Sequence, residues 1–223
     1  MSDGTPTNLD GRPTGSVGPP YPGAVARPFR QQIDEGILDR AAALFARRGF
    51  TKTSVQDVAD AVGLSKAGLL HHYPSKDVLH EAVLAQAETL GKRVLEQVEH
   101  LPLGAARDRR AVEVLVDVAL AHPGVVALLL APATQGEPGA DGSLTEGAGA
   151  MALAAFGVDP ETTDTERCVR VVGALGALAV LTLAARQADL TPAWRPFVVG
   201  TCFDALGHRR PRATPPSPSP TEV

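Results

Sequence analysis

Residues 53–79 read TSVQDVADAVGLSKAGLLHHYPSKDVL, and this stretch decides the fold. Thr53 followed three residues later by Gln56 is a capping-box pattern, which opens a helix. Gly63 then interrupts the helical pattern, and Ser65 is a residue type that caps the start of a new helix. The stretch therefore predicts two short helices joined by a tight turn.

The flanking sequence completes the motif. The second short helix is expected from Lys66 to about His72, because Pro74 disfavours helical backbone in the residue before it. Upstream, apolar residues recur at spacings of three and four between Arg30 and Arg48, and Gly49 can end that helix. A longer helix that buries the backs of two short ones is a three-helix helix-turn-helix.

The stretch from Ile33 to Leu84 resembles the DNA-binding domain of the TetR family of transcriptional regulators. Its most specific part is residues 68–79, which are similar to the end of the family's recognition helix and its junction to a long fourth helix. Two departures are Leu70, where the family often has Tyr, and Tyr73, where Phe is usual. The residues that carry the resemblance are Ala42 to Phe50, Thr53-Ser54-Val55, Ala59, Gly63, Ser65-Lys66 and Leu69 through Leu79.

Helix-turn-helix geometry places the N-terminal part of the second short helix against base edges in the major groove. Lys66 is the first candidate for direct readout, because its ammonium can donate to the N7 and O6 acceptors of guanine. Ala67 and Gly68 are small enough to let the backbone approach the bases.

Backbone phosphates are expected to bind the hydroxyl of Thr53 or Ser54, His72, Lys76 and the free N–H groups that begin the fourth helix. The neighbouring pair of histidines makes a poor metal site, because adjacent helical side chains point about 100° apart. We expect no metal and no cofactor. The complete set of predicted DNA-binding residues is Thr53, Ser54, Ser65, Lys66, Ala67, Gly68, Leu70, His71, His72 and Lys76.

The composition, 44% apolar and 21% charged, is that of an ordinary soluble protein. The formal net charge of −4 excludes a generally basic coat but allows a small local reading surface. The longest uncharged apolar run, Val171 to Ala185, is shorter than the roughly 18 residues of a membrane span. No secretory signal is visible, so a cytoplasmic protein without a membrane segment is expected.

The predicted fold class is all-α, with an N-terminal helix-turn-helix domain followed by a helical ligand-binding and dimerisation domain. Residues 1–29 and 209–223 are rich in Gly, Pro, Ser and Thr and are expected to be disordered tails. The DNA-binding domain is expected over 30–78 and the regulatory domain over 79–208. The regulatory helices are predicted at Lys76 to about Leu101, Asp108–Ala121, Val125–Leu130, Leu144–Phe156, Asp164–Gln187 and Thr191 to Gly207.

The family resemblance assigns the last two long helices, about 164–187 and 192–206, to a four-helix homodimer interface. Small residues such as Gly173 and Gly176 would allow close helix approach there, although an intramolecular core has the same pattern. An effector pocket is expected among the fourth to eighth helices, with His100, His122 or Gln135 as polar candidates. The effector itself cannot be read from the sequence.

The resemblance therefore implies a sequence-specific transcriptional regulator that binds double-stranded operator DNA and is released by an unidentified small molecule. Repression is the family default, although the residues do not choose between repressor and activator. An enzyme is disfavoured because no catalytic constellation is visible. The remaining alternative is a helical adaptor without operator binding. Cys168 and Cys202 fit a reducing compartment, and a redox role for them is disfavoured.

Overall fold

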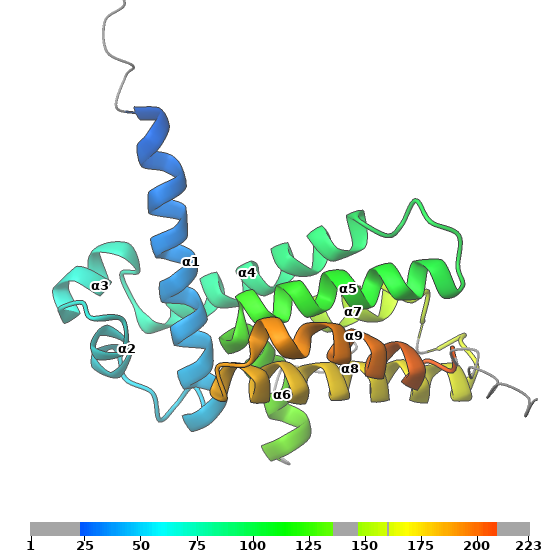
Figure 1. The fold of residues 1–223 in the computed structure, drawn as a ribbon. Helices are drawn as coiled ribbons and strands as arrows, with labels where there is room; N and C mark the ends of the chain where they lie inside the picture. Colours follow the sequence, from blue (N-terminus) through cyan, green and yellow to red (C-terminus); the bar gives the residue numbers. More distant parts are fainter. Residues whose placement is uncertain (1–22, 136–146, 160, 209–223) are drawn as a thin grey trace, which may run out of the picture.

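The computed structural model describes residues 23–135, 147–159 and 161–208. Every regular element within these ranges is an α-helix, which confirms the predicted all-α class (Figure 1). The helices are α1 Gly23–Arg48, α2 Val55–Val62, α3 Lys66–His72, α4 Lys76–Glu96, α5 Ala105–Ala121, α6 Pro123–Gln135, α7 Gly147–Ala155, α8 Thr165–Gln187 and α9 Thr191–Ala205.

The caps of α2 and α3 form largely as the sequence predicts, with a shift of one residue at the first. Ser54, not Thr53, is the N-cap of α2, and its capping-box partner is Asp57 rather than Gln56. Gly63 ends α2 with φ 72°, in the left-handed region that glycine tolerates. Ser65 caps α3 by accepting a hydrogen bond from the Gly68 N–H at 3.0 Å.

The three N-terminal helices α1–α3, called the head below, share one apolar core with α4 and with single residues of α6 and α7. Leu69 of α3 is completely buried and anchors this short helix to the core at its centre. His80 of α4 lies against the rings of Phe45 and Phe50, and burial lowers the pKa of His80. The core residues are Ile37, Leu38, Ala41, Ala42, Phe45, Val58, Ala59, Leu69, Leu79, Val83, Ala87, Leu90, Val125 and Ala148.

Several boundaries differ from the predictions. Helix α1 begins at Gly23, inside the stretch predicted as a tail. Helix α4 ends at Glu96 rather than near Leu101, because the backbone tightens into a turn that buries Val98. Helix α6 starts at Pro123, which is possible because the first turn of a helix needs no proline N–H.

One further prediction concerns the segment between α6 and α7. Helix α7 is described only from Gly147 to Ala155. The first residues of the helix predicted at Leu144–Phe156 lie outside the described residues.

The remaining helices form a second apolar core in which α8 packs against α5, α6 and α9. By length and composition α8 could cross a membrane. In this structure α8 lies along one edge of the helical bundle (Figure 1), and residues such as Val171 and Ala174 are buried against neighbouring helices. Cys202 of α9 is fully buried, and burial raises the pKa of its thiol to about 11, which disfavours thiolate chemistry.

A buried ionic cluster joins the ends of α5, α8 and α9. The Asp108 carboxylate is 1% exposed. It accepts a hydrogen bond from Arg167 at 2.7 Å, and its other oxygen lies 2.7 Å from Nε2 of His208. Arg167 also donates to the Phe156 carbonyl. Asp108 therefore depends on its partners to offset the loss of water.

We predict that Arg167→Leu lowers the free energy of unfolding by about 3–5 kcal/mol, because it leaves a buried carboxylate without its cation. Arg170→Leu is the matched control, since Arg170 pairs with Glu166 on the exposed side of the same helix and should change stability by less than about 1 kcal/mol. Denaturant unfolding of both variants measures the difference. Equal losses would contradict the assignment.

Candidate functional site

The start of α3 lies on the surface of the three-helix head. Lys66 and Ala67 are exposed, and Gly68 is partly exposed. A side chain at position 68 would approach the Ser65 hydroxyl at 3.2 Å, so the small residue keeps the cap intact. The N-terminal end of α3 therefore presents the Lys66 ammonium group beside two small residues, as is expected of a helix that enters the major groove.

Two predicted phosphate ligands are engaged inside the protein. Thr53 is 1% exposed, and its hydroxyl donates to the Gly49 carbonyl at 2.8 Å. The Lys76 ammonium donates to the Phe50 carbonyl at 3.0 Å and lies 4.2 Å from the centre of the Phe50 ring. Both side chains thus contact the loop between α1 and α2, and their assignment as phosphate ligands stays a prediction.

The other predicted residues remain on the surface of the head. Ser54 and His71 are exposed, whereas Leu70 is only partly exposed. His72 is also exposed, with its Nδ1 3.2 Å from a carboxylate oxygen of Asp34. A phosphate at this position would compete with that carboxylate. Tyr73 is half-buried in the head core, and burial together with Asp34 raises its pKa to about 12.

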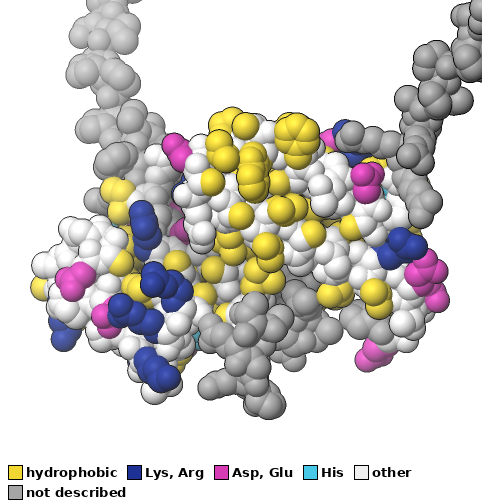
Figure 2. Space-filling view, turned by 60° about the horizontal axis from the view of Figure 1, so that its bottom comes forward, with side chains coloured by type: hydrophobic (Ala, Val, Ile, Leu, Met, Phe, Trp, Pro, Cys, Tyr) yellow, Lys and Arg dark blue, Asp and Glu magenta, His cyan; other side chains and the backbone are white. Residues whose placement is uncertain are grey.

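Two surface groups near the start of α2 were missed by the sequence analysis. Lys52 is exposed in the loop that precedes the helix, and Gln56 is exposed on its first turn, where its amide donates to Asp60 at 2.7 Å. The sequence signal that could have identified Lys52 is a cation placed just before a helix N-terminus. Figure 2 shows Lys and Arg side chains gathered at the α1–α3 end of the molecule.

Comparison with known proteins places this head in a defined group. The family model "Bacterial regulatory proteins, tetR family" matches residues 37–83, which are the residues that build the head and its core.

Residues 37–83 are therefore a domain similar to that of the bacterial regulatory proteins of the TetR family.

Its curated relatives match mainly in this domain. HTH-type transcriptional repressor KstR2 of Rhodococcus jostii is 46% identical over 48 residues, 22% of this chain and 24% of the relative. HTH-type transcriptional regulator RutR of Escherichia coli is 40% identical over 52 residues, 23% of this chain and 24% of RutR. The nucleoid occlusion factor SlmA of Pasteurella multocida is 27% identical over 106 residues, 47% of this chain and 53% of SlmA.

Among solved structures, a putative tetR family transcription regulator from Shewanella sp. PV-4 is similar over 78% of this chain and 95% of its own. The sequence identity is 19% and the TM-score 0.48. The chain spans about a quarter of the length of KstR2 and RutR and about half of SlmA.

The head is joined to the helices that follow it through Asp39. This α1 carboxylate accepts hydrogen bonds from the N–H groups of Gly124 at 2.8 Å and Val125 at 3.1 Å, in the first turn of α6. A Cβ at position 124 would lie 1.8 Å from the Asp39 carbonyl oxygen, so glycine is required for this approach. Burial is the main influence on Asp39 and raises its pKa despite these hydrogen bonds.

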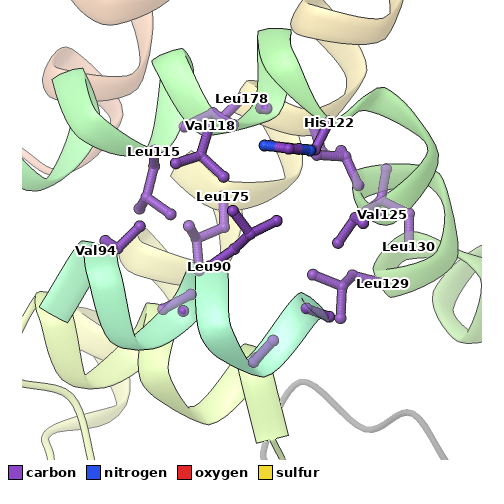
Figure 3. Close-up of a pocket in the computed structure, with 18 of the residues that line it drawn as sticks. Leu90, Val94, Leu115, Val118, His122, Val125, Leu129, Leu130, Leu175 and Leu178 are labelled. Atoms are coloured by element: carbon purple, nitrogen blue, oxygen red, sulfur yellow. The ribbon is translucent and has the colours of Figure 1, made fainter. Parts of the chain in front are cut away.

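A cavity of about 200 Å³ lies beside this joint, among α4, α5, α6, α7 and α8. Such a void costs roughly 5 kcal/mol at about 24 cal/mol per Å³ if it stays empty. Of the three polar candidates, His122 lines the cavity, His100 is exposed outside it, and the side chain of Gln135 lies outside the described part. Figure 3 shows the His122 imidazole among aliphatic side chains.

We predict that Asp39→Ala destabilises the protein by about 1–3 kcal/mol, because two backbone N–H groups lose their acceptor. Asp39→Asn keeps an acceptor oxygen without the charge. Because the folded-state pKa of Asp39 is raised, the ionised carboxylate costs stability, so Asp39→Asn should be at least as stable as wild type near pH 7. Its advantage should vanish as pH falls through the folded-state pKa, where the wild-type side chain also becomes neutral. Denaturant unfolding at several pH values measures this. An advantage for Asp39→Asn that grew towards acidic pH would contradict it.

Proposed function

We propose that the protein is a homodimeric transcriptional repressor that binds operator DNA through α2 and α3 and leaves it when a small molecule fills the cavity. The exposed N-terminal end of α3, with Lys66 at its first position, carries this proposal. Two identical heads related by a two-fold axis would read two half-sites of a symmetric operator. The protein acts in the cytoplasm as a regulator rather than an enzyme.

On the DNA, Lys66 reads base edges while the Ala67 and Gly68 backbone lies close to the groove floor. Lys52 and His72 hold phosphates on either side, while the Ser54 hydroxyl remains in the capping box of α2. This division follows from accessibility, since these groups are exposed. Thr53 and Lys76 act indirectly, by holding the loop that positions α2.

We predict that Lys66→Ala relaxes the preference for one base pair by about 1–3 kcal/mol. Lys52→Ala should weaken binding to all DNA sequences by a similar factor. It should also reduce the slope of the logarithm of the binding constant against the logarithm of the salt concentration by about one unit. Lys92→Ala, on the exposed side of α4, is the control and should change neither. Selection of bound fragments from the source genome by the wild-type protein would identify the operator. Titration of that operator with each variant at several salt concentrations would then give the slopes. Failure of wild type to select any DNA would favour the adaptor function.

The dimer is proposed to form through α8 and α9. Within the described residues, large apolar side chains are exposed along this side of the molecule, and Phe197 is 74% exposed. Val169 and Val180 of α8 are 65% and 61% exposed. Figure 2 shows hydrophobic side chains spread over this face. Exposed apolar surface of this kind is typical of an interaction site.

We predict that Phe197→Asp converts the dimer to a monomer, because a carboxylate would have to be buried at the interface without a partner. Leu103→Asp places the same charge on another exposed apolar side chain, 66% exposed in the loop before α5, and should stay dimeric. Sedimentation velocity distinguishes the two. A Phe197→Asp protein that sedimented like wild type would place the interface elsewhere.

Release requires the effector to prefer a conformation with the wrong head separation. The route we propose runs through α6, whose side chains Val125 and Leu129 line the cavity and whose first turn is capped by Asp39 of the head. Widening the cavity would displace α6 and with it α1. A fully apolar filler with equal affinity for both conformations would bind without releasing DNA.

A further inference from the structure

The cavity has a one-sided chemistry that restricts what it can hold. Its described lining consists of Ala, Val, Leu and Gly residues from five helices together with His122, the one polar residue in that described set. Among the residues that the structure describes, no Lys, Arg, Asp or Glu belongs to the lining, and neither does any Phe, Tyr or Trp. An ionised group placed deep in such a space loses its hydration without a counter-charge.

His122 stands at the edge of the cavity where α5 ends and α6 begins. It is the C-cap residue of α5, and its backbone N–H donates to the Val118 carbonyl at 2.8 Å. Within the described residues its imidazole has no hydrogen-bond partner, while Asp39 interacts with it electrostatically from the side of the head. The ring therefore offers a nitrogen to one polar group, and the nearby Asp39 carboxylate would disfavour an anion.

The volume limits the size of the occupant. An apolar cavity of about 150 Å³ takes a benzene molecule and remains dry when empty. Scaling from that case, a cavity of about 200 Å³ accommodates about eight non-hydrogen atoms. The narrow aliphatic walls suit a short chain or a small saturated ring better than an extended aromatic system.

We propose that the cavity binds a small, uncharged aliphatic molecule of about eight non-hydrogen atoms that carries one hydrogen-bonding oxygen, held by His122. Alcohols, ketones and lactones belong to this class. The inference deepens the proposed function by naming the class of its effector. It also gives that effector a point of action, because His122 directly precedes the first turn of α6, which Asp39 holds against the head.

The test uses the full-length protein, without DNA, and three probes of equal chain length: 1-heptanol, heptanoate and heptylammonium, at pH 7.5. Isothermal titration calorimetry should show saturable binding of 1-heptanol, with at least tenfold weaker binding of the two ions. Binding of either ion as tight as that of the alcohol would overturn the uncharged class. Absence of saturable 1-heptanol binding would overturn the proposal as a whole.

Variants locate the site. His122→Leu should weaken 1-heptanol binding about tenfold and leave binding of cyclohexane unchanged, because only the hydrogen bond is lost. His100→Leu, at an exposed histidine outside the cavity, is the matched control and should bind like wild type. Equal affinity of wild type and His122→Leu for 1-heptanol would overturn the role of the imidazole.

Filling the cavity gives an independent check. Ala152→Phe from α7 and Ala179→Leu from α8 add bulk to two different walls, and each should abolish 1-heptanol binding. Circular dichroism and thermal unfolding establish which variant folds. The 1-heptanol affinity of the folded variant then shows whether the ligand binds in this cavity. Retained 1-heptanol affinity in a folded filled variant would place the ligand elsewhere.

A separate measurement of operator binding distinguishes failure of the proposed ligand class from failure of the proposed function. If 1-heptanol binds as expected but wild type selects no DNA, the ligand class stands and the proposed function fails. If wild type selects an operator but 1-heptanol does not bind, the proposed function stands and the ligand class fails.

Discussion

The seating of the first turn of α6 on α1 is the constraint on which the rest of the molecule depends. The Asp39 carboxylate accepts two of the N–H groups that a helix start leaves unpaired. Gly124 allows the two backbones to approach so closely that a single added carbon would collide with the Asp39 carbonyl. The contact combines hydrogen bonding with shape, so it admits little sliding. Helix α1 supplies much of the head core and α6 supplies one wall of the cavity, and each therefore fixes the position of the other.

A second rigid connection runs through α4. Leu79 and Val83, near its start, are buried in the head core, while Leu90 and Val94, two to four turns later, line the cavity. The helix is continuous between them. Closely packed helices respond to a change in one wall by moving as units rather than by deforming locally. In the proposed release, two connections, one through α4 and one through the α1–α6 contact, would turn a change in cavity width into a rotation of the head.

The sequence predicted what depends on nearby residues and missed what depends on distant ones. The Ser65 cap, the Gly63 turn and the bounds of α3 are local, and the structure confirms them. The α2 cap was displaced by one residue, because Thr53–Gln56 and Ser54–Asp57 both have the spacing of a capping box. Only burial of Thr53 against the end of α1 decides between them.

Long-range partners explain what the sequence did not predict. Lys76 bonds to a carbonyl 26 residues away, and Asp39 to N–H groups 85 and 86 residues away. Neither pairing has a signature in local sequence, so neither contact could be predicted from it. The cavity was predicted only as a region among five helices, because which apolar side chains leave a void depends on packing and not on pattern.

The charge of the head also limits how it can bind DNA. Residues 37–83 contain six Lys and Arg against five Asp and Glu, an excess of one, in a chain whose net charge is −4. Asp39 is turned inward to α6 and Asp57 is paired with Arg48, so the carboxylates are partly withdrawn from the surface that would face DNA. Binding must then rest on a few well-placed groups rather than on a broad positive field. Such a head would bind random DNA weakly, and a correspondingly large share of its affinity would come from contacts that only the correct site can make.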